Sequence, residues 1–201
     1  MNNYLKLNFK SKMKVVIPEK FEDLDSWVEE LYQEIIKAKP LVEDCKEIES
    51  FIINKRLAEV YILLDFICEM KKIPIRKNNA LEIDLIRMLR KYNLNEIYSL
   101  LNYQSTMAAS RLYEIEHSNS SGNWHQDMVF GVKISSSIDY LESKNQKPKY
   151  PKLLPENWNY SEVELFISAN VIGNYEKWEK FTPSEILALW LQATQALDNI
   201  C

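Results

Sequence analysis

The stretch Leu57–Met70, LAEVYILLDFICEM, is the most apolar part of the chain and decides the fold. Eleven of its fourteen residues are apolar, and its three charged residues are Glu59, Asp65 and Glu69. With about 100° of rotation per residue, these three fall within an arc of roughly 120° on a helix. A helix with so narrow a polar arc is normally buried on several sides. We therefore predict a central helix at Leu57–Met70.

Basic pairs and further helical patterns lie on both sides of this stretch. Lys55–Arg56 and Lys71–Lys72 are expected to mark the points where the central helix meets water. Apolar residues recur every three or four positions elsewhere in the chain, as they do on the inner faces of amphipathic helices. These patterns predict further helices that begin near Phe21, Leu41, Asn79, Leu94, Ser161 and Thr182. The predicted fold class is all-α, with six to eight helices packed around Leu57–Met70.

Capping signals support three of these helix starts. In a capping box, the first residue and an acidic residue three positions later satisfy each other's backbone N–H groups. The pairs are Asn79 with Glu82, Ser161 with Glu164, and Thr182 with Glu185. Gly173 is placed to end the helix that starts after Ser161, because glycine readily adopts the left-handed conformation found at helix ends.

Three segments depart from the helical pattern. Residues 1–17 alternate apolar and polar side chains, which predicts a short N-terminal β-like arm or hairpin before a helical domain at 18–201. Residues 143–159 contain three prolines, so we predict an extended connector that could divide this domain into two subdomains. Residues 128–134, MVFGVKI, fit either a helix or a strand because they are apolar and rich in β-branched side chains.

The composition excludes several classes of protein. A chain of 201 residues that is 46% hydrophobic and 27% charged is typical of a globular domain. With only three glycines and neither phosphate-loop motif, it gives no support for a nucleotide cofactor, and we predict none. Three cysteines without a CxxC pair predict reduced thiols and a cytoplasmic protein. No apolar run approaches the ~20 residues that span a bilayer, so no membrane association is expected.

Acidic side chains gather on one side of the first predicted helix, although the net charge of the chain is only −4. Asp25, Glu29, Glu30 and Glu34 lie away from the apolar stripe of that helix. Such a face can steer a basic protein partner and speed its association. A small acidic helical protein of this kind suits an inhibitor of a nuclease, as immunity proteins and antitoxins are, by analogy at the level of class.

Tryptophans offer a second candidate surface. Trp158 and Trp178 occur in loop-like stretches among tyrosines, and exposed aromatic residues are common anchors of protein interfaces. The alternative is that they fasten the proline-rich connector to the helices, since aromatic side chains bury large areas wherever they sit. Trp27 and Trp190 fall in or beside inner helix faces and are expected in the core.

One short run offers an enzymatic alternative. The run RLYEIEH places Arg111 six residues before His117. This spacing resembles the arginine and histidine motif of HEPN-family ribonucleases, which are small helical dimers. The resemblance implies that the two residues meet across a dimer cleft and cut RNA without a metal. It covers only seven residues and departs from the family in placing Leu112 after the arginine and Glu114 and Glu116 between the pair.

A metal site is not predicted. His117, His125, Asp127 and Glu114 would converge if the two surrounding helices formed a hairpin. However, the chain has no HxxxH, ExxH or CxxC spacing that would present two ligands on one helix face.

These observations lead to three functional hypotheses. The first is a non-enzymatic protein-binding module that occludes or scaffolds a basic partner through Asp25, Glu29, Glu30, Glu34, Trp158 and Trp178. The second is a metal-independent ribonuclease that uses Arg111 and His117. The third is a structural subunit of a larger assembly.

Overall fold

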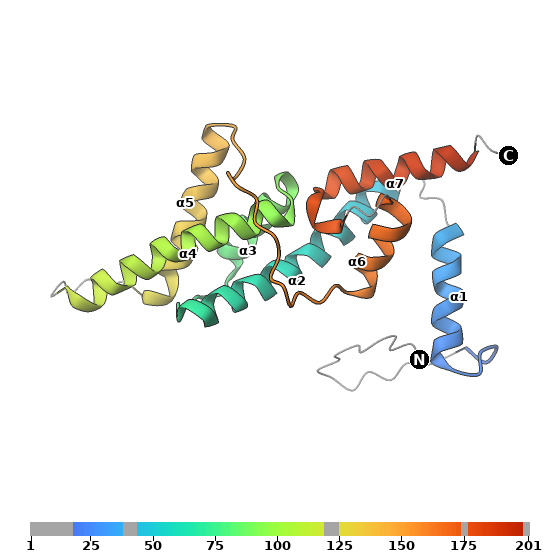
Figure 1. Ribbon diagram of the computed structural model, residues 1–201, viewed down its shortest axis with the longest axis horizontal. Coiled ribbons are helices and arrows are strands. Elements are labelled where there is room, and N and C mark those ends of the chain that lie inside the picture. The colour runs from blue at the N-terminus through green and yellow to red at the C-terminus, as the bar shows by residue number, and fades with distance from the viewer. Residues whose placement is uncertain (1–17, 38–43, 119–124, 174–176, 199–201) are drawn as a thin grey trace.

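Seven α-helices make up most of the described part of the chain (Figure 1). The structure, a computed structural model, describes residues 18–37, 44–118, 125–173 and 177–198. Within these ranges the regular secondary structure is helical and has no strand, so the predicted all-α class and helix number are confirmed. The predicted N-terminal arm, residues 1–17, lies outside the described residues. Over the same ranges, no helix is long and apolar enough to span a membrane.

Helix α2 (Cys45–Lys71) is the central helix that the sequence predicts, although it begins well before Leu57. It contributes buried side chains to two hydrophobic cores, one along each half of its length. It ends at Lys72, whose backbone is left-handed with φ of 53°. The N–H of Ile73 then donates to the carbonyl of Cys68 at 3.0 Å, which closes the last turn.

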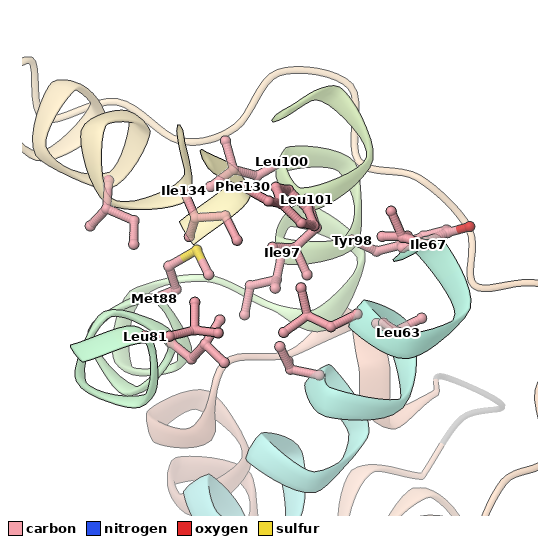
Figure 2. Close-up of a cluster of buried hydrophobic side chains, with 14 of the residues drawn as sticks. Leu63, Ile67, Leu81, Met88, Ile97, Tyr98, Leu100, Leu101, Phe130 and Ile134 are labelled. Atoms are coloured by element: carbon pink, nitrogen blue, oxygen red, sulfur yellow. The ribbon is translucent and has the colours of Figure 1, made fainter. Parts of the chain in front are cut away.

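The first core lies between the second half of α2 and three further helices. These are α3 (Asn79–Lys91), α4 (Leu94–His117) and α5 (Val129–Ser143). Figure 2 shows side chains from all four helices meeting, among them Leu63, Ile67, Leu81, Met88, Ile97, Leu101, Phe130 and Ile134. Residues 129–134 are therefore helical, and the short 3₁₀ turn η2 (Gln126–Met128) precedes them.

The second core packs against the first half of α2. Its helical segments are α6 (Glu162–Ile167), the π-helical turn η3 (Ser168–Ile172), the 3₁₀ turn η4 (Trp178–Lys180) and α7 (Pro183–Asp198). The fully or nearly fully buried side chains of this core are Ile52, Ile167, Val171, Trp178 and Ile186. Gly173 ends η3 with φ of 68°, a conformation that favours glycine, as the sequence predicts.

The proline-rich segment between α5 and α6 contains no helix, as its three prolines favour. It crosses α4 and is bonded to it. Ser99 Oγ donates to the carbonyl of Tyr150 at 2.8 Å, and the N–H of Lys152 donates to the carbonyl of Asn95 at 3.1 Å. The connector passes from the first core to the second, and its role as a boundary between subdomains stays a prediction.

Caps define the starts of α3, α4, α6 and α7. The Ser161–Glu164 and Thr182–Glu185 boxes form as predicted. The prediction that Asn79 caps α3 is wrong by one residue, because Asn78 Oδ1 accepts the hydrogen bond from the N–H of Leu81 at 3.0 Å. Helix α4 begins with a further box, in which Asn93 Oδ1 accepts from the N–H of Glu96 at 2.9 Å.

The two asparagine caps provide a first testable prediction. We expect Asn93→Ala to lower the free energy of unfolding by about 2 kcal/mol and Asn78→Ala by about 1 kcal/mol. The difference arises because the side chain of Asn93 also donates to the carbonyl of Lys180 at 3.1 Å, which joins α4 to η4. Urea unfolding of the two variants checks this, and an equal loss would show that the bond to Lys180 adds nothing.

Candidate functional site

Helix α1 (Leu24–Lys37) is amphipathic, yet its apolar side is only partly covered. Its start is capped by Asp23, whose Oδ1 accepts from the N–H of Ser26 at 2.8 Å. Leu24, Trp27 and Val28 are half-buried and Leu31 is 37% exposed. Neither core includes a residue from the described part of α1. The prediction that Trp27 is a core residue is therefore wrong, whereas Trp190 packs against the second core.

The four acidic residues predicted to bind a partner all lie on α1. Asp25, Glu29 and Glu34 are exposed, and Glu29 accepts a hydrogen bond from Gln33 at 3.1 Å. Glu30 is partly exposed and forms an ion pair with Lys20 at 2.5 Å. Three of the four carboxylates therefore form no ion pair within the described residues, and they flank the incompletely covered apolar stripe.

The two tryptophans predicted as partner anchors are not exposed anchors in this structure. Trp178 is fully buried, and its indole N–H donates to Glu59 Oε2 at 2.9 Å. Trp158 is half-buried against the first core, and its indole N–H lies 3.5 Å from Glu164 Oε1. We correct the assignment of Trp178 for this reason: the sequence suggested a loop, but the 3₁₀ turn η4 turns its ring into the second core. The alternative, that these residues fasten the proline-rich connector to the helices, describes Trp158, whereas Trp178 lies outside that connector.

The residues of the ribonuclease alternative lie at the C-terminal end of α4. Arg111 is exposed and forms an ion pair with Glu114 at 2.8 Å. His117 is exposed, its ring stacks on Tyr113 with 4.0 Å between centroids, and its Nδ1 lies 2.8 Å from the carbonyl of Tyr113. Within one chain, therefore, Arg111 contacts Glu114, whereas His117 contacts Tyr113. The cleft that the resemblance requires would have to form between two copies, and this hypothesis stays a prediction.

A buried ionic cluster, which the sequence did not predict, joins α2 to the second core. We use this name for Arg56, Glu59, Glu164 and Glu179, all of which are at most 5% exposed. Arg56 Nη2 donates to the carbonyl of Trp178 at 2.5 Å, and the guanidinium lies 4.8 Å from the centre of the indole ring. Tyr160 donates to Glu179 Oε1 at 2.9 Å. The half-buried Lys55 approaches Glu59 at 3.4 Å and Glu164 at 3.9 Å.

Burial dominates the electrostatics of this cluster. Desolvation lowers the pKa of Arg56 to about 10, although the charges of Glu59, Glu179 and Glu164 oppose it. Desolvation also raises the pKa of Glu59 to about 7, with a further contribution from the negative charge of Glu164. The hydrogen bond from Trp178 and the positive charges of Lys55 and Arg56 act in the opposite direction. Arg56 is therefore charged near neutral pH, whereas Glu59 gains and loses its proton there.

The sequence contained a signal for this cluster that we interpreted differently. We predicted that Lys55–Arg56 marks the point where the central helix meets water, and this is wrong for Arg56. Glu59, which shares the narrow polar arc with Asp65 and Glu69, is 1% exposed because η4 and α6 cover this side of α2. Of the three acidic residues in that arc, Asp65 and Glu69 are exposed. A charged pair within a helix that continues apolar on both sides is the signal that could have indicated burial.

Other candidate reactive groups are held in structural contacts. Asp127 forms an ion pair with Arg76 at 2.8 Å. Within the described ranges, no three His, Cys, Asp or Glu side chains come close enough to hold a metal ion. Burial raises the pKa of Cys68 to about 11, so this thiol is unreactive near neutral pH.

Comparisons of the chain with protein-family models, with curated proteins and with solved structures found no match.

Proposed function

We propose that the chain is a non-enzymatic protein-binding module that engages a basic protein partner through α1. One observation carries this proposal: α1 is amphipathic, but the described residues of its apolar stripe belong to neither core. In Figure 1, α1 stands apart from the body formed by α2 to α7. A helix with an incompletely covered apolar stripe is well suited to lie in a groove of another protein.

The charge of α1 specifies the chemistry of the partner. The exposed carboxylates of Asp25, Glu29 and Glu34 flank the stripe formed by Leu24, Trp27, Val28 and Leu31. A complementary partner presents an apolar groove whose rim carries lysines or arginines. The carboxylates would guide such a partner during encounter, and the apolar stripe would supply most of the buried area. Binding would act by occluding a basic surface of the partner, as immunity proteins and antitoxins do by analogy of class.

Charge reversal on α1 tests this proposal. We expect Glu29→Lys with Glu30→Lys to weaken a specific complex by about tenfold or more, because like charges would then face each other across the interface. The tagged full chain and this variant are incubated with extract of the native cell at low and high salt, and bound proteins are quantified by mass spectrometry. A partner bound through exposed charges is released as salt screens them.

A matched control separates this surface from net charge. Glu114→Lys with Glu116→Lys also reverses two acidic residues on an exposed helix, and one residue of each pair forms a surface ion pair in the wild type. The control variant should retain the partner. A photo-cross-linking residue at position 31 should attach to the same protein. If the α1 variant retains the partner as well as the control does, then α1 is not the binding surface.

A further inference from the structure

A groove of about 540 Å³ lies on the outer side of α4, where the connector and α5 border it. Its volume is within the range of roughly 300–1,000 Å³ that is typical of small-molecule sites. Leu100, Leu141 and Pro148 provide apolar lining, and none of the lining residues is acidic. The groove belongs to a different part of the fold from α1, so a ligand bound in it is independent of the proposed function.

Three tyrosines line the groove with exposed rings. Tyr103 of α4 is 61% exposed, Tyr140 of α5 is 59% exposed and Tyr150 of the connector is 86% exposed. Tyr150 has φ of 59°, a left-handed conformation that is rare for an aromatic residue and is often found at functional sites. Ser99 Oγ holds this conformation by donating to the carbonyls of Lys149 and Tyr150. Rings held outward in this way offer faces on which a planar ligand can stack.

An amide without a partner also faces the groove. Gln104 lines it and is only 8% exposed, yet its side chain makes no hydrogen bond to any other described residue. Its amide atoms are not among the fully buried side-chain atoms without a partner, so they reach solvent at the groove, where a ligand can bond to them. The amide carries both a donor and an acceptor, and glutamine can pair in a bidentate manner with the N6 and N7 atoms of adenine. A ligand that presents these groups would satisfy it.

One lysine lines the groove, and a second is bonded to two of the lining residues. Lys149 lines the groove directly. Lys71 Nζ donates to the carbonyl of Asn102 at 3.1 Å and to Thr106 Oγ1 at 2.8 Å, and both of these residues also line the groove. Burial, and then the nearby charge of Lys152, lower the pKa of Lys71. Within the described residues, neither Lys149 nor Lys71 forms an ion pair with a carboxylate, so an anionic ligand would be attracted here.

We propose that this groove binds an adenine nucleotide. The base stacks against Tyr103 and Tyr140, its edge pairs with the amide of Gln104, and the phosphates lie toward Lys149, on the side of the groove where Lys71 bonds to Asn102 and Thr106. Aromatic stacking, hydrogen bonds to the edge of the base and nearby positive charge are features by which proteins commonly recognise nucleotide bases.

Calorimetric titration of the full chain with ATP, AMP and GTP tests this assignment. We expect ATP to bind more tightly than AMP, because it places more negative charge near the lysines, and more tightly than GTP. Tyr103→Ala should weaken ATP binding by about tenfold through the loss of stacking. Lys149→Ala should weaken ATP binding more than AMP binding. Gln104→Leu should bring the affinities for ATP and GTP closer together.

Tyr113→Ala is the matched control, because Tyr113 is 64% exposed on the same helix and does not line the groove. This variant should bind ATP as the wild type does. Tyr103 and Lys149 are exposed, so these two substitutions keep the test decisive even if Gln104→Leu fails to fold. The assignment is overturned if ATP gives no binding at millimolar concentration, if Tyr113→Ala weakens binding as much as Tyr103→Ala, or if only an adenine oligonucleotide binds.

Discussion

Replacing Arg56 with methionine should lower the free energy of unfolding by about 3–5 kcal/mol, which is the usual cost of removing one partner from a buried ion cluster. Arg56 is fully buried, and Glu59, Glu164 and Glu179 are nearly so. Without the guanidinium, their negative charges lose the main positive charge buried among them. Methionine fills much of the same space, so the loss measures charge and hydrogen bonding more than packing.

The loss of stability should be large because Arg56 makes two kinds of contact with Trp178. Its Nη2 satisfies the carbonyl of Trp178 at 2.5 Å, and its planar face lies on the indole ring at 4.8 Å. Trp178 in turn donates to Glu59, so one substitution disturbs the whole link between α2 and η4. The cluster is also incompletely satisfied, since Arg56 Nε and Nη1 make no hydrogen bond within the described residues. A substitution that removes several charges together can therefore cost less than one that removes Arg56 alone.

Urea unfolding of two further variants checks this interpretation. Arg111→Met removes an exposed arginine with a single ion pair, and it should change the free energy of unfolding by less than about 1 kcal/mol. Arg56→Met combined with Glu59→Gln should recover part of the loss, because it removes a positive and a negative charge together. A loss below about 1 kcal/mol for Arg56→Met alone would show that the buried cluster does not stabilise the fold.

The helical architecture was predictable because it depends on local patterns. The apolar period predicted the central helix, and the capping residues predicted the starts of α6 and α7, where each box satisfies backbone N–H groups within one turn. Residues 129–134 were ambiguous from composition alone. Their helical state follows from tertiary contacts, because Phe130 and Ile134 share one side of α5 and both enter the first core.

The burial of charged and aromatic residues was not predictable in the same way. Whether Arg56 and Trp178 meet water depends on a contact between residues that are far apart in the sequence, and the apolar residues around Lys55–Arg56 hint at burial without identifying the partner. For the groove, likewise, Tyr103, Tyr140 and Tyr150 come from three segments that only the fold brings together. In contrast, the acidic residues of α1 were found from the sequence, since they lie on a single helix.

Stability should fall as pH rises from about 5 to about 8, and Glu59 should be the main cause. Burial raises the pKa of this carboxyl from its ordinary value of 4.5 to about 7. A raised pKa means that the folded protein holds this proton more tightly than the unfolded chain does. The resulting stabilisation is fully present below pH 4.5 and is lost as pH rises through 7. A shift of this size corresponds to about 3 kcal/mol.

The groups that face Glu59 support this direction. Lys55, Arg56 and the indole N–H of Trp178 favour the charged form, but desolvation and the charge of Glu164 outweigh them. Other shifted carboxyls act in a different pH range. Hydrogen bonds from Thr182 and from Lys91 and Arg87 lower the pKa values of Glu185 and Glu142, so their contributions to stability are lost only below pH 4.5.

Measuring the free energy of unfolding of Glu59→Gln in urea between pH 5 and pH 8 isolates the contribution of this carboxyl. Glutamine keeps an oxygen that can accept from Trp178, but it cannot become charged. The decline with pH should therefore shrink in this variant, whereas the exposed control Glu116→Gln should decline as the wild type does. If the free energy of unfolding of Glu59→Gln declines with pH as much as that of the wild type, a group other than Glu59 causes the decline. Glu59 is then charged throughout this range and paired with Arg56 and Lys55.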